Sequence, residues 1–135
     1  MILLDTHVII WTLAGTKIRA QAPQAIEKAR PVDELVVSAI SAYEIALLVR
    51  KRRLTLSMTP AAYVRALLGR NDVAEAVVTA AIAERAAGLP DEFVGDPMDR
   101  IIVATALELA CPLVTRDASI LAFARTTKRF AAVRA

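Results

Sequence analysis

The chain has 135 residues, 56% of them hydrophobic, and a formal net charge of +3. This composition predicts one domain, residues 1–135, with a single sizeable core. One cysteine excludes an internal disulfide and, with one histidine, argues against a zinc site or Cys–His catalysis. No apolar run approaches the ~20 residues of a membrane span, and no basic stretch precedes the apolar N-terminus. We therefore expect a cytoplasmic protein that has no membrane partner.

Short apolar runs alternate with helical segments along the chain. Residues 2–4 and 35–38 are predicted to be buried strands of a parallel sheet, and further strands are expected near 75–78 and 113–115. Residues 130–133 are a candidate edge strand. The pattern predicts an α/β fold, a three-layer α/β/α sandwich around a central, mainly parallel sheet of four or five short strands.

Two carboxylates fall on the carboxyl edge of the predicted sheet early in the chain. Asp5 directly follows the first strand. Glu44 lies in the first turn of a helix that is predicted to begin near Ser41, just after the second strand. Because a helix that follows a parallel strand begins at the carboxyl end of that strand, Asp5 and Glu44 are expected at the same edge.

Three more carboxylates reach this edge from the C-terminal half. A helix is predicted over Pro97–Ala110, which makes Asp96 its N-cap and Asp99 its third residue. The short connection to the strand at 113–115 requires the helix to run antiparallel to that strand, so the N-terminus of the helix returns to the carboxyl edge. Asp117 leaves the same strand there.

A cluster of carboxylates predicts a metal ion. Like charges within a few ångströms repel one another, and without a counter-ion some would stay protonated through raised pKa values. An all-oxygen donor set suits Mg²⁺ or Mn²⁺ better than zinc. Such ions activate water and neutralise charge on a departing phosphate oxygen. The acids therefore predict a metal-dependent nuclease.

Each of these acids except Asp5 also has a simpler interpretation as part of a helix cap. Ser41 and Glu44 have the S-x-x-E spacing of a capping box. Asp96 and Asp99 suit a helix start, where acidic side chains interact favourably with the helix dipole. The residue at position 117 suits the N-cap of the helix that follows it. Taken singly the acids leave both interpretations open, and their convergence on one edge favours a site.

Basic side chains near the acids also have two interpretations. Arg100 and Arg116 each adjoin a proposed site acid, and we expect them to neutralise the acidic cluster, hold a substrate phosphate, or both. The basic run at 50–53 closes the helix that carries Glu44. That run suits either contact with RNA or a favourable interaction with the helix dipole.

Three ring-bearing side chains lie near the proposed site in sequence. His7 is expected to be a turn residue rather than a catalyst, because the chemistry does not require it. Trp11 and Tyr43 are expected to pack into the core. Stacking of either ring on a nucleic-acid base is the alternative.

Four blocks of the sequence resemble the signature segments of PIN-domain ribonucleases, and most of all those of VapC-type toxins of type II toxin–antitoxin systems. The blocks are residues 3–11, 38–45, 96–106 and 113–117, and they occur in the expected order over nearly the whole chain. One departure is Cys111, where many relatives have a glycine that leaves the helix in a left-handed turn.

The resemblance implies which residues form the site and what they do. Asp5, Asp99 and Asp117 are expected to hold Mg²⁺ directly or through water. Glu44 is expected to complete the site or to orient the nucleophile. Hydrolysis of RNA by metal-activated water should then leave a 5′-phosphate and a 3′-hydroxyl. The other expected contributors are an auxiliary acid of the D-P-x-D-R pattern and hydroxyl groups that bind a ligand or water: Asp96, Ser41 and Thr115.

The resemblance also implies protein partners. Toxins of this type are held inactive by a small cognate antitoxin whose C-terminal segment lies across the groove of the toxin, and they usually form homodimers. The apolar region at 54–68 is a candidate for such an interface, although core packing explains its residues equally well.

Three other interpretations remain. A receiver-type signalling domain also gathers acids at the edge of a parallel sheet, but it needs paired acids after its first strand, where Asp5 stands alone. A PIN-like scaffold that binds nucleic acid without cutting it is a second alternative. A PIN-like nuclease that processes RNA without acting as a toxin is the third.

Overall fold

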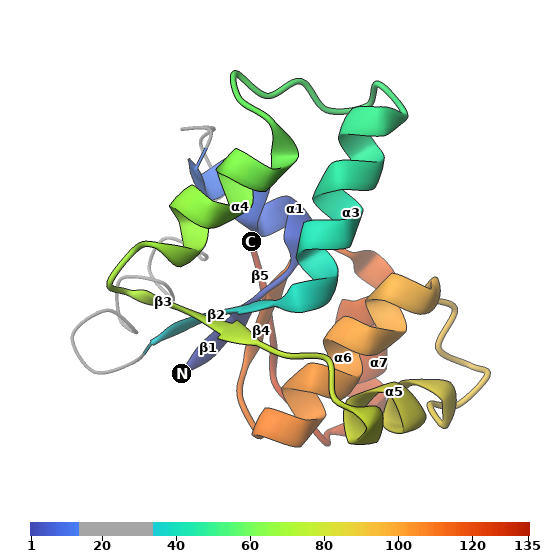
Figure 1. The fold of residues 1–135 in the computed structure, drawn as a ribbon. Coiled ribbons are helices and arrows are strands. Elements are labelled where there is room, and N and C mark those ends of the chain that lie inside the picture. The colour runs from blue at the N-terminus through green and yellow to red at the C-terminus, as the bar shows by residue number, and fades with distance from the viewer. Residues whose placement is uncertain (14–33) are drawn as a thin grey trace.

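The computed structural model of the protein describes residues 1–13 and 34–135, which form a parallel sheet with helices on both faces (Figure 1). The strand order is β3-β2-β1-β4-β5, and every described pairing is parallel. This confirms the predicted three-layer α/β/α fold. The order differs from the 2-1-3-4-5 order of receiver domains, so the receiver alternative is wrong. The strands are β1 (Ile2–Leu4), β2 (Leu35–Ser38), β3 (Val73–Ala76), β4 (Leu113–Thr115) and β5 (Ala132–Arg134).

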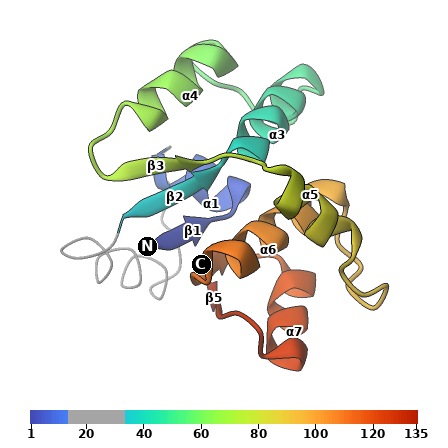
Figure 2. The same ribbon diagram turned by 60° about the horizontal axis from the view of Figure 1, so that its bottom comes forward.

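Helices cover both faces of the sheet (Figure 2). Helices α1 and α4 pack on one face, α6 and α7 pack on the other, and α5 packs against α6. None of the helices in the two described ranges is long and apolar enough to cross a membrane. The helices are α1 (Thr6–Leu13), α3 (Ala39–Arg50), α4 (Pro60–Leu68), α5 (Ala80–Ala87), α6 (Pro97–Leu109) and α7 (Ala118–Thr127).

The central strands are apolar along their whole length because both of their faces are covered. Side chains alternate between the two faces of a strand, so Ile2 and Leu4 join the core under α1 and α4, while Leu3 joins the core under α6 and α7. All three side chains of β1 are buried. This two-sided burial explains why the strands at the centre of the sheet were predictable as continuous apolar runs.

The ends of the edge strands differ from the prediction by one or two residues. The strand expected at 75–78 is β3 at Val73–Ala76, because its pairing with β2 ends at Ala76 and Thr79 is already the N-cap of α5. The candidate edge strand at 130–133 is β5 at Ala132–Arg134. Phe130 instead packs its ring against Phe123 of α7.

The end of α6 explains the unusual residue Cys111. The helix ends at Leu109, and Ala110 takes the left-handed conformation with φ 48°, so the left-handed turn lies one residue before the cysteine. Cys111 itself is buried in the core between the sheet and α6. A glycine is therefore not required at 111, and the turn into β4 forms without it.

Candidate active site

The ends of β1 and β4 lie side by side and hold three predicted site residues together. Asp5 is 5% exposed, and each of its carboxylate oxygens accepts a hydrogen bond. The Thr6 backbone N–H donates to Oδ1 at 2.7 Å, and the Thr115 hydroxyl donates to Oδ2 at 2.5 Å. The Thr115 hydroxyl in turn accepts from the backbone N–H of Asp117 at 3.0 Å. Folding of the two strands therefore fixes this part of the site.

The two carboxylates of this group have opposite electrostatic tendencies. Burial raises the pKa of Asp5 above its usual value, although the hydrogen bonds from Thr115 and Thr6 oppose the rise. Burial also acts to raise the pKa of Asp117, but hydrogen bonds from Ser119 and from the Ile120 N–H outweigh it and lower the pKa. Asp117 is the N-cap of α7, as its simpler interpretation predicted, and this role keeps it ionised.

Glu44 belongs to α3 but does not cap it. The helix begins at Ala39, and its N-cap is Ser38, whose hydroxyl accepts from the Ile40 N–H at 3.3 Å. Glu44 therefore lies in the second turn rather than the predicted first turn, and the alternative in which it forms a capping box with Ser41 is wrong. The side chain is 8% exposed, and its Oε2 atom is buried without a hydrogen-bond partner among the described residues. A buried carboxylate oxygen without a partner is costly, so Glu44 lacks the structural explanation that a cap would give it.

Thr6 is a site residue that the sequence interpretation missed. Its hydroxyl donates to the Ser41 hydroxyl at 2.9 Å, and its side chain also interacts with the Glu44 carboxylate. Burial raises the pKa of Glu44; the polar side chain of Thr6 opposes this rise, and the charge of Asp5 adds to it. The signal that could have found Thr6 is its position directly after Asp5, at the start of a helix. Ser41 is fully buried, so its predicted contact with a ligand is replaced by this internal contact.

Asp96 and Asp99 form a reciprocal capping box at the start of α6. Oδ1 of Asp96 accepts from the Asp99 N–H at 2.8 Å, and Oδ2 of Asp99 accepts from the Asp96 N–H at 3.1 Å. The predicted positions of both residues in the helix are confirmed. Burial and the neighbouring charge of Asp96 raise the pKa of Asp99 to about 7, and Asp117 and Asp5 contribute further repulsion. Asp99 is thus both a helix cap and a carboxyl group that is hard to ionise.

Arg100 does not neutralise the acidic cluster, contrary to expectation. Its guanidinium donates to the backbone carbonyl oxygens of Ala86 at 3.0 Å and Phe93 at 3.3 Å, and it also binds those of Ala87 and Leu89. The side chain therefore ties α6 to the end of α5 and to the loop that follows. A cation near the carbonyl end of a helix is favourable, which explains this orientation.

Arg116 and Trp11 form a pair beside the site. The guanidinium carbon of Arg116 lies 4.5 Å from the centroid of the Trp11 ring, a cation–π distance. Trp11 is only partly buried, so its expected place in the core is wrong. Tyr43 is 57% exposed, so the same expectation fails there. His7 lies on α1 rather than in a turn, and its ring is 5.7 Å from that of Trp11.

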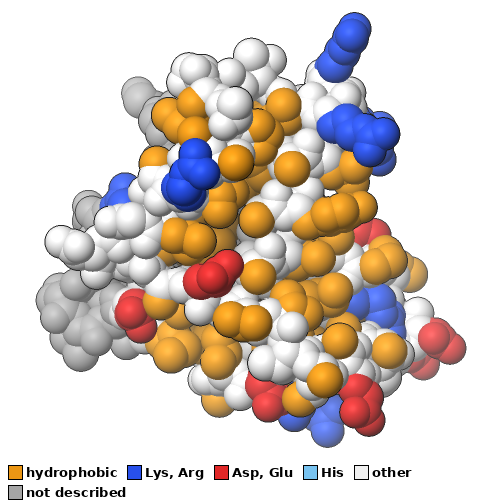
Figure 3. Space-filling view, viewed as in Figure 1, with side chains coloured by type: hydrophobic (Ala, Val, Ile, Leu, Met, Phe, Trp, Pro, Cys, Tyr) orange, Lys and Arg blue, Asp and Glu red, His pale blue; other side chains and the backbone are white. Residues whose placement is uncertain are grey.

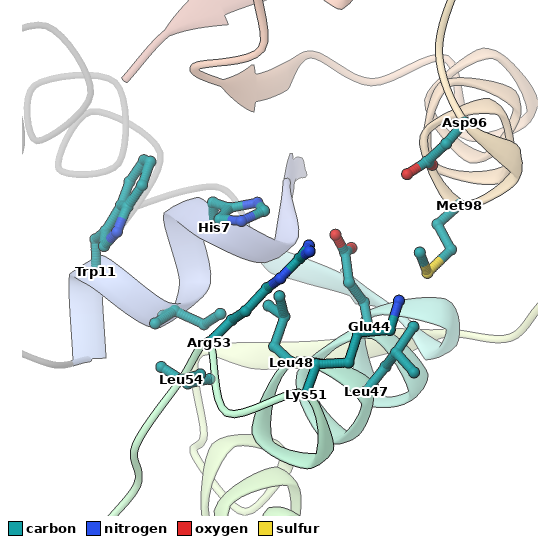
Figure 4. A pocket seen from close by; sticks show the side chains of 11 residues that line it. His7, Trp11, Glu44, Leu47, Leu48, Lys51, Arg53, Leu54, Asp96 and Met98 are labelled. Atoms are coloured by element: carbon teal, nitrogen blue, oxygen red, sulfur yellow. The ribbon is translucent and has the colours of Figure 1, made fainter.

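A pocket of about 450 Å³ opens beside Glu44 (Figure 4). Helices α1 and α3 form its main walls, and Asp96 and Met98 face it from the start of α6. Its lining joins apolar side chains of α1 and α3 to the cations Lys51 and Arg53. The acids of the site therefore lie next to a space that can hold part of a ligand.

The oxygen donors at this edge have the chemistry that a hard divalent cation requires. In the described residues, however, their side chains do not yet converge on one position for the ion. In the described ranges, no group of three His, Cys, Asp or Glu side chains is arranged to hold a metal ion. The donors at this edge are all oxygens, the Oε2 atom of Glu44 lacks a partner, and the pKa of Asp99 is about 7 through burial and repulsion. A cation would relieve both the missing interaction and the repulsion, and Mg²⁺ or Mn²⁺ is the ion that such donors prefer.

Comparisons with known proteins agree with this arrangement. The PIN domain family matches residues 2–128. Ribonuclease VapC22 of Mycobacterium tuberculosis is 40% identical over 117 residues, which cover 86% of each chain. A toxin–antitoxin complex from Klebsiella pneumoniae has a TM-score of 0.64 at 27% identity, with 90% of this chain and 91% of that chain covered. VapBC2 from Rickettsia felis, bound to a DNA fragment from its promoter, has a TM-score of 0.72 at 14% identity and covers 99% and 98%. The last likeness bears on the fold alone.

Proposed function

This chain belongs to the PIN-domain family, and on that premise we propose that it is a metal-dependent endoribonuclease, the toxin of a toxin–antitoxin pair. The observation that carries the proposal is the electrostatic coupling of acids from separate elements. Burial raises the pKa of Asp99 most, and the charges of Asp96, Asp117 and Asp5 raise it further. The charges of Asp5 and Asp96 also raise that of Glu44. Acids that raise one another's pKa at one edge of a sheet are typical of a functional site rather than of a stabilising surface.

The proposed ligands of Mg²⁺ or Mn²⁺ are Asp5, Asp99 and Asp117, with Glu44 completing the site or orienting the attacking water. When bound there, the cation supplies Lewis-acid activation of water and neutralises charge on the departing oxygen of the phosphodiester. Asp5 is held for this role by Thr6 and Thr115, so it needs no reorganisation. Hydrolysis would leave a 5′-phosphate and a 3′-hydroxyl.

The proposed partners are a cognate antitoxin and a second copy of this chain. The Klebsiella pneumoniae relative is a toxin–antitoxin complex, which supports the first partner. A cluster of acidic side chains would accept a basic side chain of an inhibitor, and such a side chain would compete with the metal. For the homodimer, the candidate region at 54–68 includes Met58, which is 46% exposed, whereas Leu67 is already part of the core.

The proposal is tested by cleavage and growth together. Purified protein should cut RNA in Mg²⁺ and not in a chelator, and expression of the chain alone should arrest growth. Asp5→Ala should remove both effects, and co-expression with the cognate antitoxin should restore growth and give a co-purifying complex. Cleavage without growth arrest would reduce the proposal to a non-toxin nuclease. RNA binding without cleavage would favour a non-cutting scaffold.

Metal binding has its own test. A ligand at a hundredfold excess over its dissociation constant stabilises a fold by about 2.7 kcal/mol. Mg²⁺ or Mn²⁺ at millimolar concentration should therefore raise the melting temperature in calorimetry, and Asp99→Asn should remove most of the rise. A melting temperature that stays constant across the titration would contradict the proposed site.

A further inference from the structure

The pocket beside Glu44 has a lining that the acidic site does not explain. Its apolar side chains come from α1, α3 and the residue after the basic run: Ile10, Leu47, Leu48 and Leu54. His7 and Trp11 add rings on the α1 side, and Lys51 and Arg53 add cations on the α3 side. Figure 4 shows Glu44 and Arg53 extending into the same part of the pocket. A flat apolar group and an adjoining anion would satisfy both kinds of lining.

Only half of the basic run at 50–53 takes part in this lining. Lys51 and Arg53 line the pocket, whereas Arg50 and Arg52 do not. Figure 3 shows that the basic side chains gather over the end of α3. Interaction with the helix dipole alone would not require every second cation to face one pocket, so the arrangement indicates a more specific role.

The backbone conformation at the end of α3 determines which of these basic side chains line the pocket. The N–H of Arg53 donates to the carbonyl of Leu48 at 2.9 Å, and the N–H of Arg52 donates to that of Val49 at 3.0 Å, which is the Schellman pattern. Arg52 takes the left-handed position of this motif with φ 58°, where glycine is usual. The turn reverses the chain, so Arg53 points back toward the pocket that Lys51 already lines.

The cations of the pocket are available for an anionic ligand. In residues 1–13 and 34–135, neither Lys51 nor Arg53 forms an ion pair with a carboxylate. On the α1 side, the guanidinium carbon of Arg116 lies 4.5 Å from the centroid of the Trp11 ring, but Arg116 is not part of the pocket lining. The two cations that line the pocket therefore come from the end of α3, at a short distance from the acids Glu44 and Asp96 of the same lining.

The geometry points to a nucleotide subsite: the pocket takes one unpaired nucleotide of the RNA substrate, with its base against the apolar floor and the rings of His7 and Trp11. Lys51 and Arg53 bind the phosphate of that nucleotide. This inference rests on the proposed nuclease function and adds to it a place where the strand is held next to the cleaved bond. Bases of any sequence stack on aromatic rings, and cations track the phosphates, so the two kinds of lining match a single-stranded segment.

A nucleotide fits the lining better than a peptide segment does. An inhibitory peptide that brings a basic side chain to the acids would be repelled by Lys51 and Arg53 at the same entrance. RNA has the opposite preference, because its phosphates are repelled by the acids and attracted by these two cations. Lys51 and Arg53 thus offset the repulsion between the acids of the site and the phosphates of the RNA.

Fluorescence of the single tryptophan tests the subsite without cleavage. Trp11 is the one tryptophan of the chain, so its emission reports on this pocket. The wild-type protein in a chelator at low ionic strength is titrated with short 5′-phosphorylated oligoribonucleotides of each base, and saturable quenching is expected. Lys51→Gln and Arg53→Gln should each raise the dissociation constant about tenfold and lower the slope of log affinity against log salt by about one. Arg50→Gln, which removes the same charge from the same run, should leave both values unchanged.

Cleavage kinetics in Mg²⁺ separate this inference from the proposed function. Lys51→Gln and Arg53→Gln should raise KM about tenfold with kcat within about twofold, because they bind the strand without taking part in the chemistry. If the three Gln variants bind oligoribonucleotides alike, the subsite is wrong even when RNA is cleaved. If quenching requires Lys51 and Arg53 but no RNA is cleaved, the subsite stands and the nuclease proposal fails. Quenching by the antitoxin alone, with no response to RNA, would assign the pocket to the protein partner and overturn the inference.

Discussion

The strand side and the helix side of the acidic site differ in how their carboxylates are held. On the strand side, Asp5 accepts hydrogen bonds from the first residue of α1 and from the last residue of β4, and Asp117 accepts hydrogen bonds from the first turn of α7. On the helix side, Glu44 has a carboxylate oxygen without a hydrogen-bond partner among the described residues, and burial together with the charge of Asp96 raises the pKa of Asp99 to about 7. Folding completes one side and leaves the other dependent on a ligand.

This difference has a physical origin in the elements that carry the acids. A residue at the end of a central strand is surrounded by backbone N–H groups and by hydroxyls of the adjoining strand, so its position and charge are fixed with the sheet. A residue on a helix surface that faces the site meets mainly the other acids. The helix side is therefore where a cation should have its largest effect on stability, and the strand side is where it should have its smallest.

The largest expected effect is the loss of RNA cleavage when an acid of the helix side, Asp99, is replaced. Asp99→Asn should lower RNA cleavage by at least ~100-fold, because it removes a proposed metal ligand. The same change should leave the metal-free protein as stable as the wild type or more stable, since it removes repulsion from Asp96, Asp117 and Asp5. Cleavage assays and thermal melts in a chelator measure the two effects. Asp91→Asn, in an exposed loop, is the matched control, and full activity of Asp99→Asn would remove this residue from the site.

The strand side should respond in the opposite way. Thr115→Val keeps the shape of the side chain but removes the hydroxyl that donates to Asp5 and accepts from the Asp117 N–H. Both groups lie in or beside the buried edge, so the loss should lower the free energy of unfolding by about 1–3 kcal/mol. Chemical denaturation with and without Mg²⁺ provides the measurement. Thr126→Val is the control, because its hydroxyl bonds only an exposed helix carbonyl, and equal costs for the two variants would contradict a fixed strand side.

Much of this comparison was predictable from sequence, and the exceptions have identifiable causes. Asp96 and Asp99 were placed correctly because a proline at the first helical position and an acid before it define a helix start. A cap remained an alternative for Glu44 because Ser38 and Ser41 are both suitable caps, and only the sheet decides where β2 ends. Arg100 was misassigned because its partners are backbone carbonyls, which no side-chain pattern records. Arg100 is next to Asp99 in sequence, but its side chain points away from the acids, toward these carbonyl oxygens.

A smaller effect is expected in the pH dependence of stability, which should reveal the raised pKa of Asp99 on the helix side of the site. A carboxyl group whose pKa is raised on folding binds more protons in the folded state, so stability falls as pH rises between the unfolded and the folded pKa. For Asp99 this window runs from the usual aspartate pKa of 3.8 to a pKa of about 7 in the folded protein. Since the side chain is partly solvated, we expect a loss of about 1–2 kcal/mol rather than the full shift. Melts of metal-free protein from pH 5 to 8 should show the decline, and Asp99→Asn should flatten it. A decline that is equally steep in the variant would assign it to other groups.

The smallest expected effect concerns Asp96. This residue lies on the helix side of the site, but its hydrogen bond to the Asp99 N–H makes it the N-cap of α6. Asp96→Ala removes the oxygen that accepts from the Asp99 N–H and should cost about 1 kcal/mol of stability, less whatever is regained from reduced repulsion of Asp99. Asp96→Asn retains an N-cap acceptor and removes the charge, so it should match or exceed the stability of the wild type. Both variants should keep most of the cleavage activity. Denaturation and cleavage assays on the pair separate the two roles, because a loss of activity in Asp96→Asn comparable to that of Asp99→Asn would make the charge, rather than the cap, the reason for an acid at 96.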